Sequence, residues 1–117
     1  MHSKKTSYKI GLYSEFLARW FLRFHGYKIL KNRYITGKNT DRAEIDIIAR
    51  RKNTIVFIEV KCRQSIDAAW GAITPSQSAR LRRAAETYLI NTHWTGDARF
   101  DVIVVCNHKI YWAKNAI

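Results

Sequence analysis

Two carboxylates and a lysine occur in the sequence in an order suited to phosphodiester chemistry. Asp46 is followed thirteen residues later by Glu59, and Lys61 comes two residues after that. Mg²⁺ takes hard oxygen ligands, typically one or two carboxylates completed by water and phosphate. A cation between two acids offsets their repulsion of a phosphodiester, and a lysine can orient water or stabilise developing charge. These three residues predict metal-dependent hydrolysis of nucleic acid.

Both acids fall in β-branched segments that predict a hairpin. The segments are 45–49 and 54–60, and a polar stretch separates them. With the turn centred on residues 52–53, Asp46 lies directly opposite Glu59. A slip of one residue would send the two acids to opposite faces of the sheet, which a half-buried sheet resists.

The same register places Glu44 opposite Lys61, so that all four charged side chains are expected to share one face. The other face is then expected to carry Ile45, Ile47, Ile58 and Val60. An alternative is a solvated ladder of ion pairs, in which Glu44 pairs with Lys61 and Asp46 with nearby arginines. Two acids facing each other beside apolar residues favour the nuclease-type site over this ladder.

Motifs along nearly the whole chain resemble one known family. They are Glu15, Gly26-Tyr27, Ile29-Leu30, Asn32-Arg33, Glu44-Ile45-Asp46-Ile47-Ile48-Ala49, Val56-Phe57-Ile58-Glu59-Val60-Lys61-Cys62-Arg63, Gly71, Gln77, Arg80-Leu81, Ala85, Tyr88-Leu89 and Arg99-Phe100-Asp101-Val102. Together they resemble the PD-(D/E)XK nuclease superfamily, and more closely its small YraN-like proteins. These are similar in core fold to Holliday-junction resolvases.

The resemblance implies an α/β, restriction-endonuclease-like αβββαβ core, with a mixed sheet flanked by helices. It also implies that Asp46 and Glu59 are metal ligands for Mg²⁺ or Mn²⁺ and that Lys61 is the catalytic lysine. Glu15 would contribute from the first helix, and Gln77 would lie beside the active site.

Composition indicates a nucleic-acid partner. The chain has 117 residues, with 21 Lys plus Arg against 9 Asp plus Glu, a formal net charge of +12 and a pI near 10.1. This is the charge balance of a polyanion binder. We expect one domain over residues 1–117 with a basic N-terminal tail at about 1–6. No apolar stretch nears the roughly twenty residues needed to span a membrane, and no secretory signal is evident, so the expected location is the cytoplasm.

A first helix is expected over residues 7–24. Its main apolar stripe is formed by Ile10, Tyr13, Leu17, Trp20 and Phe24. Glu15 falls instead on a second strip with Gly11, Ala18 and Leu22, whose small members allow close approach to the sheet. Glu15 is therefore expected either to reach the acid pair or to form a solvated pair with Arg19.

A second helix is expected from Thr74 to about Asn91. Thr74 is the predicted N-cap, Pro75 the first helical residue, and Gln77 stands three residues after the cap, which is a capping-box pattern. Two roles are therefore open for the Gln77 side chain: it caps the helix, or it lines the active site.

Basic residues outside the hairpin are candidate nucleic-acid contacts. Lys38 lies in a polar loop predicted at 35–42 after a first strand at 27–33, and Arg63 opens a second predicted loop at 63–72. Arg80 and Arg83 lie on the second helix, where a basic face either binds phosphates or is solvated. Trp70, in the second loop, is expected to pack on the core in preference to stacking on a base.

Two final strands are expected at 99–105 and 109–112. Asp101, at the start of the first, is expected to satisfy local backbone or an arginine. Cys62 and Cys106 form neither a disulfide framework nor a zinc pattern and are expected to pack as small hydrophobes.

The leading hypothesis is a metal-dependent endonuclease acting on DNA, with structured or branched DNA in repair or recombination as its substrate. The alternative from another class is a catalytically silent accessory protein that binds nucleic acid. A third is a basic scaffold that docks on a protein. Resolution of a four-way junction would call for a homodimer with two-fold symmetry.

Overall fold

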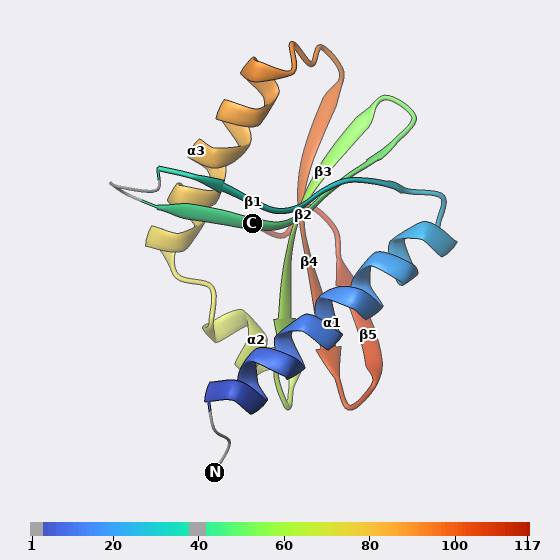
Figure 1. Cartoon of the computed structure of the whole chain (residues 1–117), viewed down its shortest axis with the longest axis vertical. Coiled ribbons are helices and arrows are strands. Elements are labelled where there is room, and N and C mark those ends of the chain that lie inside the picture. The colour runs from blue at the N-terminus through green and yellow to red at the C-terminus, as the bar shows by residue number, and fades with distance from the viewer. Residues whose placement is uncertain (1–3, 38–41) are drawn as a thin grey trace.

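A mixed sheet of five strands forms the centre of the molecule (Figure 1). The computed structural model describes residues 4–37 and 42–117. In chain order the elements are α1 (Lys4–Phe24), β1 (Lys28–Thr36), β2 (Ala43–Arg51), β3 (Thr54–Cys62), α2 (Ile66–Gly71), α3 (Pro75–Asn91), β4 (Asp97–Cys106) and β5 (Lys109–Ala113). The strands lie side by side in sequence order; β3 and β4 are parallel, and the other neighbours are antiparallel. The predicted α/β class and helix-flanked mixed sheet are confirmed.

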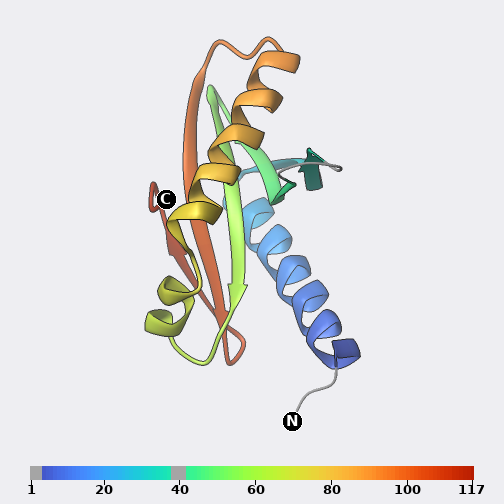
Figure 2. The same ribbon diagram turned by 90° about the vertical axis from the view of Figure 1, so that its left-hand side faces the viewer.

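The helices cover opposite faces of the sheet (Figure 2). Ala18 and Leu22 of α1 pack against one face, in a cluster with Ile47, Ile58 and others. On the other face α3 packs in a separate cluster, whose fully or nearly buried members are Ala43, Ile45, Ile48, Ile55, Phe57, Leu81, Ala84, Ala85 and Tyr88. Between β3 and β4 the chain crosses over the sheet through α2 and α3. This connection allows the two strands to run parallel, because parallel neighbours need a crossover.

The β2–β3 hairpin has the predicted register. Ile47 pairs with Ile58, and the ladder continues without a shift to Arg51 and Thr54. Lys52, in the turn, adopts a left-handed conformation with φ 55°. The β-branched segments and the polar turn therefore sufficed to fix the pairing.

Alternation of the side chains breaks near Asp46, contrary to prediction. Ile45 packs in the α3 cluster with Ile48, whereas Ile47 packs in the α1 cluster. The neighbouring strand is also irregular here: Arg33, which the β1–β2 register places opposite Asp46, has φ 55° and lies between regularly paired residues. The twist introduced at this point turns Ile45 away from the face expected for it.

Of the two apolar strips predicted on α1, the second one, which contains Ala18 and Leu22, faces the sheet. Tyr13, Trp20 and Phe24 are 48%, 47% and 84% exposed, while Ala18 and Leu22 are fully buried. Only Leu17 of the predicted stripe packs against the core. Small side chains let α1 approach the sheet closely, and this packing outweighs the greater apolarity of the aromatic side.

Several boundaries differ from the predicted ones. Helix α1 begins at Lys4, within the segment expected to be a tail, and β1 extends to Thr36 into the predicted first loop. The second predicted loop contains α2, capped by the Ser65 hydroxyl, which accepts from the Ala68 amide. Trp70 on α2 remains 38% exposed, so the expected packing on the core is only partial.

Helix ends follow their local sequence. Gly26, with φ 85°, ends α1 in a Schellman motif, in which the Tyr27 amide donates to the Leu22 carbonyl. Thr74 caps α3 as predicted, and its hydroxyl accepts from the Gln77 amide. In the described part of the chain, no helix is both long and apolar enough to cross a membrane.

Candidate functional site

The two acids of the hairpin come together where β2 and β3 part. Asp46 and Glu59 follow the last regular pair of the ladder, Ile47 with Ile58. In place of a ladder bond, the Val60 amide donates to Oδ2 of Asp46 at 2.8 Å. The irregularity at Asp46 therefore aims its carboxylate across the gap between the strands toward the segment that carries Glu59.

Burial raises the pKa of both carboxyl groups. The main cause at Asp46 is loss of hydration, and the neighbouring Glu59 charge adds to it, bringing the pKa of Asp46 to about 9. Burial also raises the pKa of Glu59, against the opposing effects of Asp46 hydrogen bonding and the Lys61 charge. The pair therefore retains a proton readily unless another positive charge is present.

One oxygen of Glu59 remains unpartnered. The Glu59 side chain is 7% exposed, and its Oε1 lies 3.4 Å from Nζ of Lys61. Its Oε2 is buried, with no hydrogen-bond partner among the described residues. A buried oxygen without a donor is costly, and a cation bound there would remove that cost.

Lys61 joins the acid pair, but not through the predicted partner. It pairs with Glu59 on its own strand, while Glu44 lies 3.8 Å from Arg42. The Glu44–Lys61 pair of the alternative ion-pair ladder does not form, because the regular β2–β3 ladder ends before it reaches these residues. The four charged groups do not share one face.

Glu15 reaches the site from α1 but is held by an arginine. Its two oxygens accept from Nε and NH2 of Arg33 at 3.2 and 3.1 Å. The Arg33 partner, rather than the expected Arg19, lies on β1 at the left-handed position opposite Asp46. Glu15 thus lines the site with its charge balanced, and it raises the pKa of Asp46 only weakly.

Two pockets open on the acid pair, one from each side. The first, of about 340 Å³, lies under α1 and is lined by Ile10, Gly11, Ser14, Glu15, Asp46, Glu59, Val60, Lys61, Cys62 and Arg63. The second, of about 220 Å³, lies under α3 and is lined by Arg42, Ala43, Glu44, Asp46, Glu59, Gln77, Arg80 and Leu81. Asp46 and Glu59 therefore separate two basic-rimmed openings.

Helix α3 supplies two of the predicted residues, Gln77 and Arg80, to this site. Gln77 lines the α3-side pocket, and its backbone amide takes part in the helix cap. The hydrogen bonds of the described residues do not include the reciprocal bond from the Thr74 amide, so the Gln77 side chain is not held in a capping box. Arg80 lines the same pocket and donates to the Ser76 hydroxyl at 3.1 Å.

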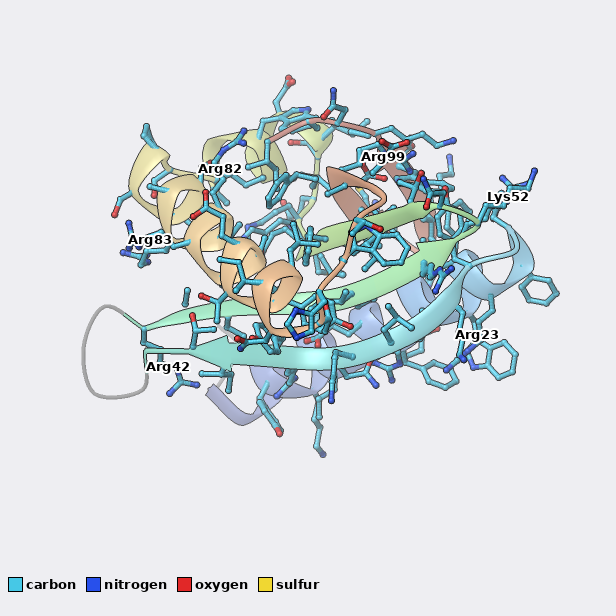
Figure 3. The ribbon with its side chains drawn as sticks, turned by 90° about the horizontal axis from the view of Figure 1, so that it is seen from above. Arg23, Arg42, Lys52, Arg82, Arg83 and Arg99 are labelled. Carbon is cyan, nitrogen blue, oxygen red and sulfur yellow. The ribbon has the colours of Figure 1, made fainter. Side chains whose placement is uncertain are left out.

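The other candidate nucleic-acid contacts are placed differently. Arg63 is exposed at the rim of the α1-side pocket. Arg83 projects from α3 on the same side of the molecule as Arg42, far from Lys52 in the β2–β3 turn (Figure 3). It lines neither of the two pockets. Lys38 lies outside the described residues.

The residues present fit a hard divalent cation. Asp46 and Glu59 offer carboxylate oxygens whose raised pKa values and unpartnered atom favour a positive charge between them. In residues 4–37 and 42–117, no three His, Cys, Asp or Glu side chains form a metal-holding group. A cation here would take two protein ligands, and water or phosphate would fill its remaining positions, as Mg²⁺ sites commonly do.

A family model described as "Uncharacterised protein family UPF0102" matches residues 14–105, a segment that contains the whole acid site. The chain belongs to the UPF0102 family. A UPF0102 protein of Bradyrhizobium diazoefficiens is 40% identical over 107 residues, covering 90% of this chain and 77% of that protein. Another, of Paramagnetospirillum magneticum, is 36% identical over 102 residues, covering 86% and 79%.

Membership in UPF0102 agrees with the YraN-like resemblance seen in the sequence. Three features of the site had no clear signal in the sequence: the Arg33 partner of Glu15, the Val60 amide bonded to Asp46, and Arg42 at the second pocket. The first two depend on the irregular backbone at Arg33 and Asp46. A left-handed arginine leaves no mark in a pattern of residue types.

Proposed function

We propose that this protein is a metal-dependent endonuclease of the PD-(D/E)XK type that hydrolyses DNA phosphodiesters, with structured or branched DNA as its substrate. The observation that carries the proposal is the pairing of half-buried Asp46 with buried Glu59, with one Glu59 oxygen unpartnered and Lys61 3.4 Å from the other. Two acids held side by side out of water are of little use to a protein that only binds a polyanion.

In this proposal Asp46 and Glu59 hold Mg²⁺ or Mn²⁺. When bound, the metal lowers the pKa of a water ligand and offsets charge on the phosphate. Lys61 stands beside Glu59 in the α1-side pocket, where its ammonium orients the attacking water or stabilises charge on a phosphate oxygen. Glu15 and Gln77 border the two pockets and position groups around the pair.

The basic residues bind the backbone of the DNA. Arg63 at one pocket and Arg80 at the other stand where phosphates on either side of the scissile bond would lie. The net charge of +12 adds a general attraction that salt weakens. The protein would meet its DNA in the cytoplasm, and cutting a four-way junction symmetrically would require a homodimer.

The experiment is cleavage of labelled single-stranded, duplex, flapped and four-way-junction DNA with Mg²⁺ or Mn²⁺. We expect Glu59→Gln and Lys61→Ala each to lower the cutting rate by a factor on the order of 10² to 10³, because each removes charge stabilisation at the reacting phosphate. Glu86→Gln, which changes an exposed acid on α3, is the matched control and should cut like the wild type.

Cutting that survives in Glu59→Gln, or in the presence of a chelator, would point to a contaminating nuclease and contradict the proposal. If no substrate is cut but all proteins bind DNA with equal salt sensitivity, the protein is a catalytically silent accessory protein.

A further inference from the structure

The outer side of α1 carries a row of exposed aromatic rings. Tyr13, Phe16, Trp20 and Phe24 recur every three or four residues, and each is at least 47% exposed. We call these four residues the aromatic face. They lie on the side of α1 away from Ala18 and Leu22, which are fully buried against the sheet. The Tyr13 ring also contacts the ring of His108 in the β4–β5 turn, with 6.1 Å between the ring centres, whereas no other element of the described chain lies over the outer side of the C-terminal half of α1 in Figures 1 and 2.

We propose that the aromatic face binds a single-stranded segment of nucleic acid by stacking on its bases, next to the acid site. This deepens the proposed function, because it names the part of a branched substrate that α1 receives. Aromatic rings combined with positive charge form the usual platform for single strands, since every base offers a ring face whatever the sequence.

Charge on the outer side of α1 matches a polyanion. Lys9 and Arg23 are exposed there among the rings, and the Arg23 guanidinium lies 5.2 Å from the centre of the Trp20 ring. Arg23 projects outward from the end of α1 (Figure 3). The one acidic residue of α1, Glu15, is bound to Arg33. A phosphate backbone alongside the rings would therefore meet positive groups.

Ring spacing favours a single strand over a duplex. The ring centres of Phe16 and Trp20 are 6.4 Å apart, and those of Trp20 and Phe24 are 6.3 Å apart. This is about twice the ~3.4 Å rise between stacked bases in a duplex. Successive bases of an extended strand can each meet a ring, whereas bases paired inside a duplex cannot.

The aromatic face adjoins the acid site. Ile10, Gly11, Ser14 and Glu15 of the same helix line the pocket that contains Asp46, Glu59 and Lys61. Ile10, at the edge of this pocket, is 37% exposed, and Tyr13 follows it on the outer side of the helix, so a strand leaving the pocket reaches the rings after passing the edge of α1 at Ile10. In a flapped or branched substrate, the unpaired arm would lie on α1 while the junction lies at the acid pair.

Two other occupants fit less well. Amphipathic helices that lie on membranes place basic residues on a polar face opposite the apolar one, but here that opposite face is buried in the core and the basic residues stand among the rings. A second copy of the chain would bring Lys9 and Arg23 against their like in a protein of net charge +12.

The test measures binding of a labelled oligo(dT) of about 16 nucleotides, long enough for one platform, and of a blunt duplex. Proteins carry Glu59→Gln throughout, so that binding is read without cutting. We expect Trp20→Leu and Phe16→Leu each to weaken oligo(dT) binding about tenfold, because leucine keeps an apolar contact but cannot stack. Duplex binding and the slope of affinity against salt should not change, because no charge is removed.

Ile90→Ala is the matched control, because Ile90 is 70% exposed on α3 and far along the chain from the rings. Unchanged oligo(dT) binding in both leucine variants would overturn the proposal. So would equal losses on oligo(dT) and duplex, stronger binding to phosphatidylglycerol vesicles than to the oligonucleotide, or a wild-type dimer that the leucine variants dissociate.

Failure of this inference and failure of the proposed function give different results. Cutting of DNA in which the leucine variants, with Glu59 restored, match the wild type on flapped and blunt substrates would keep the nuclease and remove the platform. Oligo(dT) binding that depends on the rings, without any cutting of DNA, would keep the single-strand platform and remove the nuclease.

Discussion

Two places in the described part of the chain hold carboxylates away from water, and they treat them in opposite ways. Asp101 on β4 is fully buried, and donors surround it. Nε and NH2 of Arg99 each donate to it at 2.9 Å, Nε1 of Trp112 at 2.8 Å, and the Asn115 amide at 2.8 Å. Of the two partners expected for Asp101, local backbone or an arginine, the arginine is confirmed.

The pair of half-buried Asp46 and buried Glu59 has too few donors. Asp46 has the Val60 amide, Glu59 has Lys61, and Glu59 Oε2 has no hydrogen-bond partner in the described part of the chain. The donors at Asp101 come from the chain itself and tie β5 and the C-terminal residues to β4. At the Asp46–Glu59 pair, charge balance requires a positive charge from outside the chain. Burial of acids alone therefore does not mark a functional site, whereas burial without compensation does.

The largest expected effect is the loss of stability on removing Asp101. Asp101→Ala leaves the Arg99 guanidinium and the Trp112 indole without their acceptor, and we expect a loss of roughly 3–5 kcal/mol in the free energy of unfolding. Glu59→Gln should cost far less, because it removes a charge that the chain does not compensate. Urea titration of both variants measures the difference, and equal losses would erase the distinction between the two sites.

A smaller effect should come from divalent metal. If Mg²⁺ binds the folded pair alone, a concentration of 100 times Kd stabilises the wild type by about 2.7 kcal/mol. Thermal unfolding in MgCl₂, against NaCl of equal ionic strength, measures this gain. Glu59→Gln should lose the gain, and Asp67→Asn, which changes an exposed acid on α2, should keep it. A gain of the same size in Glu59→Gln would place the metal elsewhere.

The pH dependence of stability should also distinguish the Asp46–Glu59 pair from Asp101, with a smaller effect than that of metal. The pKa of Asp46 is raised from its ordinary value near 3.8 to about 9 in the folded protein. The unfolded chain therefore loses this proton first, and the stability contributed by protonated Asp46 falls as pH rises from about 4 to about 9.

Asp46→Asn removes this titration while its amide oxygen can still accept from the Val60 amide. Without metal, we expect the variant to be more stable than the wild type by at least about 1 kcal/mol near pH 8, or about 4 °C in Tm. The difference should shrink toward pH 4. A difference independent of pH would mean that Asp46 is not the titrating group.

The sequence predicted the parts of this contrast that depend on regular pairing. Register in the hairpin followed from two β-branched segments and one polar turn, and it brought Asp46 near Glu59. It failed one residue beyond the last pair, because the left-handed Arg33 interrupts the regular pattern. On α1 the sequence predicted two apolar strips; counting apolar residues favours the one with Trp20 and Phe24, whereas close packing buries the one with small residues such as Ala18.

The smallest expected effect concerns Glu15, which lies between the two kinds of site. Its side chain is 12% exposed, that of Arg33 is 37% exposed, and the two form a bidentate pair. A double-mutant cycle with Glu15→Gln and Arg33→Asn should give a coupling of roughly 0.5–1 kcal/mol. Asparagine is chosen because it tolerates the left-handed backbone at position 33.

Measuring the Mg²⁺ stabilisation again in Glu15→Gln then shows whether Glu15 behaves like Asp101, whose charge the chain balances, or like Glu59, whose charge it does not. Because Arg33 already balances its charge, we expect the full metal gain to persist in Glu15→Gln, so that Glu15 resembles Asp101 more than Glu59. If the gain disappears while the coupling to Arg33 is small, Arg33 must release Glu15 when metal binds. Glu15 would then be a third ligand of the metal held by the acid pair.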